Sequence, residues 1–229
     1  PVEFAPGPRS DLRRISDAAQ SVGAMLVVDA TQSMGMVPID AYSTNADAIV
    51  SSGYKWLRGT YGAAVGFISP SIVNTLKPGL MGFRSNSDIW DLRADRLELP
   101  EDASRFEFTT IHFGAALGLA AAIDELLEMG MDEVWRHDLE LADHLMTGAE
   151  GLGIEVVSPT SDSERSAIVS LRMPSGLSSL EVSNRLQSEY SILTTSRSGM
   201  LRVSPHIDTD IPQIDSLLSA LSDILSEVR

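Results

Sequence analysis

The first third of the chain alternates between helical and strand-like patterns of apolar positions. A helix is predicted between a capping serine, Ser10, and a terminating glycine, Gly23, because the apolar residues between them recur at helical spacing. A short continuous apolar run at 24–28 is typical of a buried parallel strand. Residues 47–50 and 63–68 are predicted to form two further strands, each bounded by Gly, Ser, Asn or Pro. This alternation predicts an α/β fold with a mostly parallel sheet.

The pattern changes in the second half of the chain. Breakers make residues 70–104 irregular, and long helices are predicted at 114–129 and 131–150. Strands at 154–157, 167–171, 192–195 and 200–204, with a helix at 178–188, predict a small α+β unit with an antiparallel sheet. A last helix has one apolar stripe, formed by Ile211, Ile214, Leu217, Leu218, Leu221, Ile224, Leu225 and Val228. We therefore expect one domain over 1–130 and a small C-terminal α+β domain over 131–229.

Composition narrows the range of partners and compartments. A chain of 229 residues with 43% hydrophobic content can bury a core. Its net charge of −15 argues against nucleic acid or an anionic membrane surface as a partner. The sequence contains no apolar run long enough to span a bilayer and no recognisable signal peptide. The absence of cysteine excludes a disulfide scaffold and is compatible with a reducing cytoplasm, where we expect the protein to act.

Two segments suggest a specific chemistry. The apolar run Met25-Leu-Val-Val-Asp-Ala-Thr-Gln32 ends on the carboxylate of Asp29, and a loop of small residues downstream carries Lys55. The chain has only two lysines, Lys55 and Lys77, against fifteen arginines; a lysine kept in such a chain suggests that an amine is needed. Ligands of open α/β sheets bind at the carboxyl ends of strands, where Asp29 and Lys55 fall. A carboxylate and a lysine placed together there are what a pyridoxal phosphate (PLP) enzyme requires.

The sequence segments around these residues resemble the class V aminotransferase branch of the fold-type I PLP enzymes. This branch includes cysteine desulfurases, selenocysteine lyases, isopenicillin N epimerase and kynureninase. The matching segments occur in the family's order: Asp11-Leu-Arg-Arg-Ile15, Val27-Val-Asp-Ala-Thr-Gln-Ser-Met-Gly35, Pro38-Ile-Asp40, Gly53-Tyr-Lys-Trp-Leu57, Arg105-Phe-Glu107 and Leu201-Arg-Val-Ser204. The resemblance covers nearly the whole chain but begins well inside the family's large domain, which implies that residues 1–130 are part of a large PLP-binding domain. The chain also starts at Pro1 rather than Met, so we expect a fragment of a longer enzyme.

The resemblance implies roles for the residues around Asp29. Lys55 would form the internal Schiff base with pyridoxal 5'-phosphate, and Asp29 would pair with the protonated pyridine nitrogen. Gln32 would donate to the cofactor's phenolic oxygen, and Thr31 would pack under the ring. Asp29 could instead cap the next turn of the chain, and Gln32 could be a surface residue.

Further roles come from more distant segments. Ser52 and Tyr54 would contact the phosphate, although many relatives have histidine where this chain has Tyr54. Tyrosine can donate a hydrogen bond there but cannot shuttle protons near neutral pH. Thr110 would reach the phosphate of a partner subunit's cofactor. Arg202 would bind the substrate α-carboxylate through a bidentate fork, the alternative being a strand arginine in a surface ion pair. No cluster of residues suggests a metal site.

These roles predict a PLP-dependent aminotransferase acting on a small amino acid and its keto acid. The alternatives are a lyase or epimerase of the same family, or a non-catalytic dimerising remnant. Large apolar residues in the irregular segment 80–113 favour a homodimer. The chain lacks the nucleophilic cysteine that a desulfurase needs; Thr195, Ser196 and Ser198 occupy the corresponding stretch, so we expect no transfer of sulfur to the protein.

Overall fold

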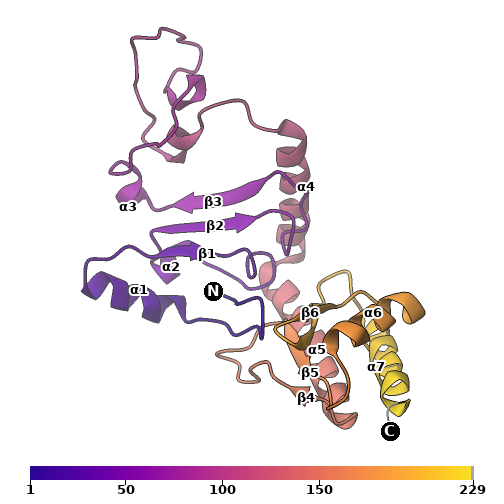
Figure 1. The fold of residues 1–229 in the computed structure, drawn as a ribbon. Helices are drawn as coiled ribbons and strands as arrows, with labels where there is room; N and C mark the ends of the chain where they lie inside the picture. Colours follow the sequence, from indigo (N-terminus) through magenta and orange to yellow (C-terminus); the bar gives the residue numbers. More distant parts are fainter. Residues whose placement is uncertain (228–229) are drawn as a thin grey trace. The chain divides into compact units, whose positions relative to one another are not determined.

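The structure, a computed structural model, describes residues 1–227 and divides into two compact units. The sheet unit comprises Leu12–Thr31 and Ile39–Glu125. The C-terminal unit comprises Pro1–Asp11, Gln32–Pro38 and the chain from Leu126 onward. Each unit has its own sheet (Figure 1). These units are compact groups of segments rather than domains with a single boundary, so the domain boundary predicted at residue 130 stays a prediction. No helix among residues 1–227 is long and apolar enough to cross a membrane.

The sheet unit is built on three strands in the order β1-β2-β3: β1 (Val27–Asp29), β2 (Ala48–Ser52) and β3 (Ala64–Ile68). β1 and β2 are parallel, with Val28 opposite Ile49, whereas β2 and β3 are antiparallel, with Val50 opposite Gly66. The sheet was predicted to be mostly parallel, and β3 departs from that prediction. The physical reason is that the loop 53–63 joins β2 directly to β3, without the helical crossover that a parallel pair needs.

Helices and a long loop complete this unit. α1 (Leu12–Ser21) and α2 (Ala41–Thr44) lie on the β1 side of the sheet (Figure 1). The Ser16 hydroxyl donates to the Asn45 carbonyl at 3.0 Å, which ties α1 to the left-handed C-cap of α2. After β3 come α3 (Pro70–Val73), two short 3-10 helices, η1 (Phe83–Ser85) and η2 (Ala103–Phe106), and α4 (Phe113–Met129). The segment predicted as irregular, 70–104, therefore contains only short helical turns.

The sheet unit contains one strand that differs from its prediction. The apolar run at 24–28 was predicted to be a buried strand, but β1 begins at Val27, and its side chains alternate between exposed, buried and exposed. Val27 is 63% exposed and Val50, on the neighbouring strand, is 46% exposed, because nothing among the described residues packs on their face of the sheet. Val28 and Ile49 are buried on the other face. The strand is therefore present but only half buried.

The C-terminal unit has a four-stranded antiparallel sheet in the order β4-β5-β7-β6, as predicted for the small α+β part: β4 (Glu155–Val156), β5 (Val169–Arg172), β6 (Thr195–Arg197) and β7 (Met200–Val203). Three helices pack with it: α5 (Met131–Gly151), α6 (Ser179–Tyr190) and α7 (Ile211–Ser226). Their apolar faces form one continuous core with the strands. Val228, the last residue of the predicted apolar stripe of α7, lies outside the described residues.

Local signals explain where α6 and α7 begin and end. Asp210 and Gln213 form a reciprocal capping box at the start of α7, which satisfies backbone donors that the helix itself cannot use. α6 ends at Ser191, which adopts a left-handed conformation, and the Ile192 N–H then donates to the Leu186 carbonyl. The strand predicted at 192–195 therefore begins only at Thr195, because Ile192 is still bonded to α6 and Thr194 pairs with the Ser183 side chain.

Candidate active site

Asp29 is the last residue of β1, at the carboxyl end of a strand that runs parallel to β2. One of its carboxylate oxygens accepts the backbone N–H of Thr31 at 2.9 Å. This bond, then a bond from the Thr31 side chain and the nearby charge of Lys55, lower the pKa of Asp29 below its usual value, although partial burial opposes the shift. Asp29 therefore stays ionised, as a partner of a pyridinium N–H must. Asp29 can cap the turn and also pair with the pyridinium N–H, because one carboxylate oxygen accepts the Thr31 N–H and the other can face the cofactor.

Thr31 also connects the ends of the two parallel strands. Its hydroxyl oxygen accepts the backbone N–H of Ser52 at 3.1 Å, and it lies 3.4 Å from the Ser52 hydroxyl. Ser52 is the last residue of β2, so this contact holds the two strand ends together beyond the sheet's own hydrogen bonds. Sequence reasoning assigned Thr31 only to packing under the ring. The structure adds that the threonine orients both Asp29 and Ser52.

Lys55 lies in the loop 53–63 that leaves the carboxyl end of β2. The loop is tightly closed, because the Gly59 N–H donates to the Gly53 carbonyl at 2.8 Å, the Gly53 N–H donates to the Ala63 carbonyl at 3.0 Å, and the Arg58 N–H donates to the Lys55 carbonyl at 2.8 Å. Lys55 is half-buried, whereas Lys77 is exposed. The amine of Lys55 is thus presented from a turn whose backbone is fixed on both sides.

Residues that sequence reasoning did not single out hold this loop in place. Arg58 has a φ of 57°, a left-handed conformation that is unusual for a residue other than glycine, and it forms an ion pair with Glu125 of α4 at 2.8 Å. A Cβ atom on Gly59 would lie 2.6 Å from a methyl of Leu119 and 3.0 Å from the Gly53 carbonyl oxygen, so only glycine fits. The visible signal was the pair of glycines that flank Lys55, but their packing partner on α4 could not be read from the sequence.

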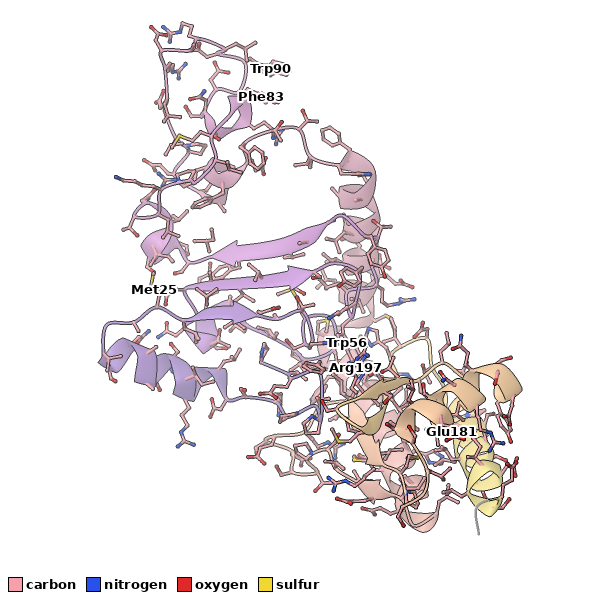
Figure 2. All side chains as sticks on the ribbon, in the orientation of Figure 1. Met25, Trp56, Phe83, Trp90, Glu181 and Arg197 are labelled. Carbon is pink, nitrogen blue, oxygen red and sulfur yellow. The ribbon has the colours of Figure 1, made fainter. Side chains whose placement is uncertain are left out.

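The aromatic neighbours of Lys55 have different environments. Trp56 is buried, whereas Tyr54 is 42% exposed and its ring stacks on Tyr61 with centroids 4.5 Å apart. Figure 2 labels Trp56. The stacked Tyr54 ring stands at the position where many relatives have histidine. The loop 53–63 therefore has no imidazole beside Lys55.

Thr110 belongs to the sheet unit but not to this cluster. It is exposed in an irregular segment between η2 and α4. The segment before it is anchored, because buried Arg105 donates to the Val73 carbonyl at 3.0 Å and to the Asn74 side chain at 2.7 Å. Arg84 pairs with Glu107 on the same segment. The structure therefore leaves Thr110 exposed at the end of an anchored stretch.

Gln32 and Arg202 belong to the C-terminal unit, so the structure does not relate them to Asp29 and Lys55. Gln32 is half-buried in a turn after β1. Arg202 lies on β7, where its Nη1 donates to the Phe4 carbonyl at 3.0 Å, and burial is the main cause that lowers its pKa. It forms no ion pair within residues 1–227, so the surface ion pair considered as an alternative role is absent.

Together, a mixed α/β fold, a charged Asp29 at the end of β1 and a lysine in the loop after the adjacent strand β2 form the arrangement expected for a PLP enzyme of the fold-type I class. Comparison with known proteins gives the family. The model of the class V aminotransferases matches residues 2–209, and the chain belongs to this family. PLP is the cofactor of the family's enzymes, which agrees with the cofactor predicted from Asp29 and Lys55.

Individual relatives carry two kinds of name. A probable cysteine desulfurase of Pyrococcus abyssi is 26% identical over 241 residues, which cover 100% of this chain and 59% of the relative. A kynureninase of Deinococcus radiodurans is 28% identical over 178 residues, covering 76% of this chain and 43% of the relative. The apo structure of a cysteine desulfurase from Thermococcus onnurineus has a TM-score of 0.88 at 26% identity and covers 99% of this chain and 58% of that one. The chain thus spans between 43% and 59% of the length of these three relatives.

Proposed function

We propose that this chain carries the lysine-bearing part of a PLP-dependent lyase that acts on a small amino acid, with cysteine as the first candidate substrate. The observation that carries the proposal is Asp29 at the end of β1, with its charge stabilised by Thr31, and Lys55 in the loop that follows the adjacent parallel strand β2. PLP, when bound, withdraws electrons from the α-carbon of an amino acid. The names of the relatives, cysteine desulfurase above all, support a lyase over the aminotransferase predicted from the sequence.

The residues fit the cofactor in the sheet unit. Lys55 would hold PLP covalently through its amine and, once released by the substrate, would take the α-proton and return it. Asp29 would keep the pyridine nitrogen protonated, because its own pKa is lowered and it remains an anion. Ser52, held by Thr31 at the end of β2, would donate its hydroxyl to the phosphate together with Tyr54.

Other groups would come from elsewhere in the molecule. Arg202 would bind the substrate carboxylate, and Gln32 would donate to the phenolic oxygen of PLP. Thr110 would contact the phosphate of the other subunit in a homodimer, for which the exposed apolar residues of the long loop are the supporting feature; Figure 2 labels two of them, Phe83 and Trp90. The family pattern leaves part of the cofactor pocket to residues outside this chain.

The hairpin between β6 and β7 distinguishes the proposed lyase from a desulfurase that forms a persulfide on one of its own cysteines. Arg197 pairs directly with Met200, so only Ser198 and Gly199 form the turn, with φ angles of 50° and 76°. Two positive φ angles are typical of the tight type I′ hairpin. This turn has no thiol and offers only hydroxyl groups, which are poor sulfur acceptors at neutral pH. Sulfur cleaved from cysteine would therefore leave as free sulfide.

The products test this proposal. The PLP-loaded enzyme, expressed with whatever native sequence adjoins this chain, is given cysteine with and without a keto acid. A lyase of the proposed type would form sulfide, pyruvate and ammonia in equal amounts without a keto acid. Alanine with protein-bound persulfide would contradict the proposal in favour of a desulfurase. Turnover that depends on the keto acid would support the aminotransferase. Absence of the Schiff-base absorbance that Lys55→Ala should remove would support the non-catalytic remnant.

A further inference from the structure

Arg202 and its cross-strand neighbour Ser170 carry polar atoms that form no hydrogen bond within residues 1–227. β7 lies between β5 and β6, and the register pairs Arg202 with Ser170 on one side and Thr195 on the other. The Nε of Arg202 and the hydroxyl of Ser170 are both buried and have no hydrogen-bond partner within residues 1–227. A buried donor without a partner is unfavourable unless a ligand satisfies it. These two groups therefore indicate a polar subsite on the small sheet.

The charge around this subsite is positive although the protein as a whole is acidic. Arg197 is two residues from Thr195 on β6, so side-chain alternation places it on the same face as Thr195 and its cross-strand partner Arg202. Desolvation and then the charge of Arg197 lower the pKa of Arg202. No carboxylate within residues 1–227 neutralises Arg202. An anion is the ligand that this pair of arginines favours.

A loop at the start of the chain fixes the guanidinium. The Phe4 carbonyl accepts a hydrogen bond from Nη1 of Arg202 at 3.0 Å. Nη1 keeps one further N–H and Nη2 has two, and one N–H from each nitrogen can form the end-on fork that binds a carboxylate through two oxygens. The Phe4 side chain is 50% exposed, whereas Arg202 is partly buried. Phe4 thus combines a backbone contact to the guanidinium with an uncovered ring.

The loop that carries Phe4 is itself closely fitted to the C-terminal unit. Side-chain hydroxyls hold its backbone: Ser158 donates to the Pro6 carbonyl, and Ser166 donates to the Gly7 carbonyl at 2.6 Å. Gly7 has a φ of +95°, and a Cβ there would lie 2.6 Å from the Ile168 carbonyl oxygen and 2.9 Å from the Ile168 Cβ. Any residue other than glycine would push the loop away from the strand region and take Phe4 with it.

We propose that the loop 2–9 is a positioning element of the substrate-carboxylate subsite. The Phe4 carbonyl orients the guanidinium of Arg202, and the Phe4 ring limits the size of the substrate side chain. This inference rests on the proposed function only for the role of Arg202. Phe4 and Gly7 are positioning residues, since neither touches the reacting atoms.

The test compares two ligands and two glycine variants. The PLP-loaded enzyme is titrated, by the absorbance of the cofactor, with a small amino acid and with the amine that has the same side chain but no carboxylate. Gly7→Ala should weaken binding of the amino acid about tenfold or more and leave binding of the amine within about twofold. Gly153→Ala is the matched control, because Gly153 lies in the same unit with a φ of +78° and nothing within 4 Å of a Cβ. Gly153→Ala should change neither the dissociation constant of the amino acid nor that of the amine.

A second measurement does not depend on the cofactor. In the protein without PLP, the Arg202 Nε–H signal is followed by nitrogen-15 NMR while a small carboxylate such as propionate is added. The signal should shift on addition, and Gly7→Ala should weaken that response about tenfold relative to Gly153→Ala. Phe4→Ala keeps the carbonyl and should instead widen the range of accepted side chains, in the amino acids and in the matching amines alike.

Three outcomes separate the two proposals. If Arg202→Ala leaves the ratio between amino acid and amine binding unchanged, the assigned role of Arg202 is wrong. If Arg202→Ala changes that ratio but Gly7→Ala does not, the loop inference alone is wrong. If Gly7→Ala and Gly153→Ala weaken both ligands equally, the effect is general destabilisation and the positioning role is rejected.

Discussion

The two units of this protein treat their apolar side chains in opposite ways. The C-terminal unit encloses one continuous core in which the strand residues Leu171 and Leu201 and the helix residues Leu145 and Leu221 are almost fully buried. The sheet unit leaves Val27 and Val50 exposed on one face of a three-stranded sheet. Hydrogen bonds around Thr31 and Lys55 connect its strand ends and loops.

This difference indicates that the C-terminal unit is the more self-contained folding unit, whereas the sheet unit carries most of the predicted chemistry. A sheet with one uncovered apolar face is incomplete as a folding unit, whereas antiparallel strands packed under three helices bury their own apolar surface. The chain covers 59% of the Pyrococcus abyssi relative and 58% of the Thermococcus onnurineus structure. The chemistry predicted for the chain lies mainly in the less self-sufficient unit.

The largest expected effect concerns the two lysines of the sheet unit. Borohydride reduction of the PLP-loaded protein should attach the cofactor to Lys55, and Lys55→Ala should abolish the label. Lys77→Ala is the matched control and should leave labelling intact, because Lys77 is exposed in a loop after α3. Peptide mapping by mass spectrometry identifies the labelled residue. A label on Lys77 would falsify the assignment.

Core substitutions should sharpen the contrast in burial. Leu171→Ala removes a fully buried side chain from the C-terminal core and should lower the free energy of unfolding by about 2–5 kcal/mol. Val27→Ala removes an exposed side chain and should change it by only about 0.5 kcal/mol in this chain. Urea denaturation of each variant measures both values. Equal losses at the two positions would mean that the exposed sheet face is covered in solution.

The turn around Lys55 offers a test of the sheet unit's fixed loop. Gly59→Ala would force a methyl against Leu119 and the Gly53 carbonyl, and should cost about 1–3 kcal/mol while weakening cofactor binding. Glu125→Ala breaks only the partly exposed ion pair with Arg58 and should cost less than about 1 kcal/mol. Thermal unfolding and PLP titration of both variants check the ranking. A reversed ranking would show that the ion pair, rather than the close glycine packing, holds the loop.

The smallest expected effect is on the titration of Asp29. Its pKa lies below the usual 3.8, so the folded state binds fewer protons than the unfolded state near that pH. The group therefore stabilises the fold above pH 3.8, and this contribution is lost as the pH falls through the lowered pKa. Thr31→Val removes the side-chain bond but keeps the backbone bond, so the midpoint should rise yet stay below 3.8. Carbon-13 NMR of the carboxyl group measures it, and a midpoint at or above 3.8 in the unsubstituted protein would contradict the assignment.

Much of the fold was predictable from local pattern. The helices ending at Met129 and Ser226 and the strands β2, β3, β5 and β7 all lie within a few residues of their predicted positions, because periodic apolar residues and breakers act locally. The antiparallel direction of β3 was not predictable in the same way. It depends on how the loop 53–63 closes through the Gly53 and Gly59 hydrogen bonds, and those join residues that a periodicity does not relate.

For the candidate site, too, the sequence determined one part and the tertiary structure decided the other. The sequence by itself determined which groups are available: one lysine between two glycines, one aspartate at the end of an apolar run, and a strand arginine near the C-terminus, all in a family's order. Only the tertiary structure decided what surrounds them. It brought Thr31 between Asp29 and Ser52, and it placed the Phe4 carbonyl on a guanidinium nearly two hundred residues away. The physical reason is that a residue's identity fixes its chemical capacity, whereas its partners, charge and desolvation are set by chain segments that meet only when the protein folds.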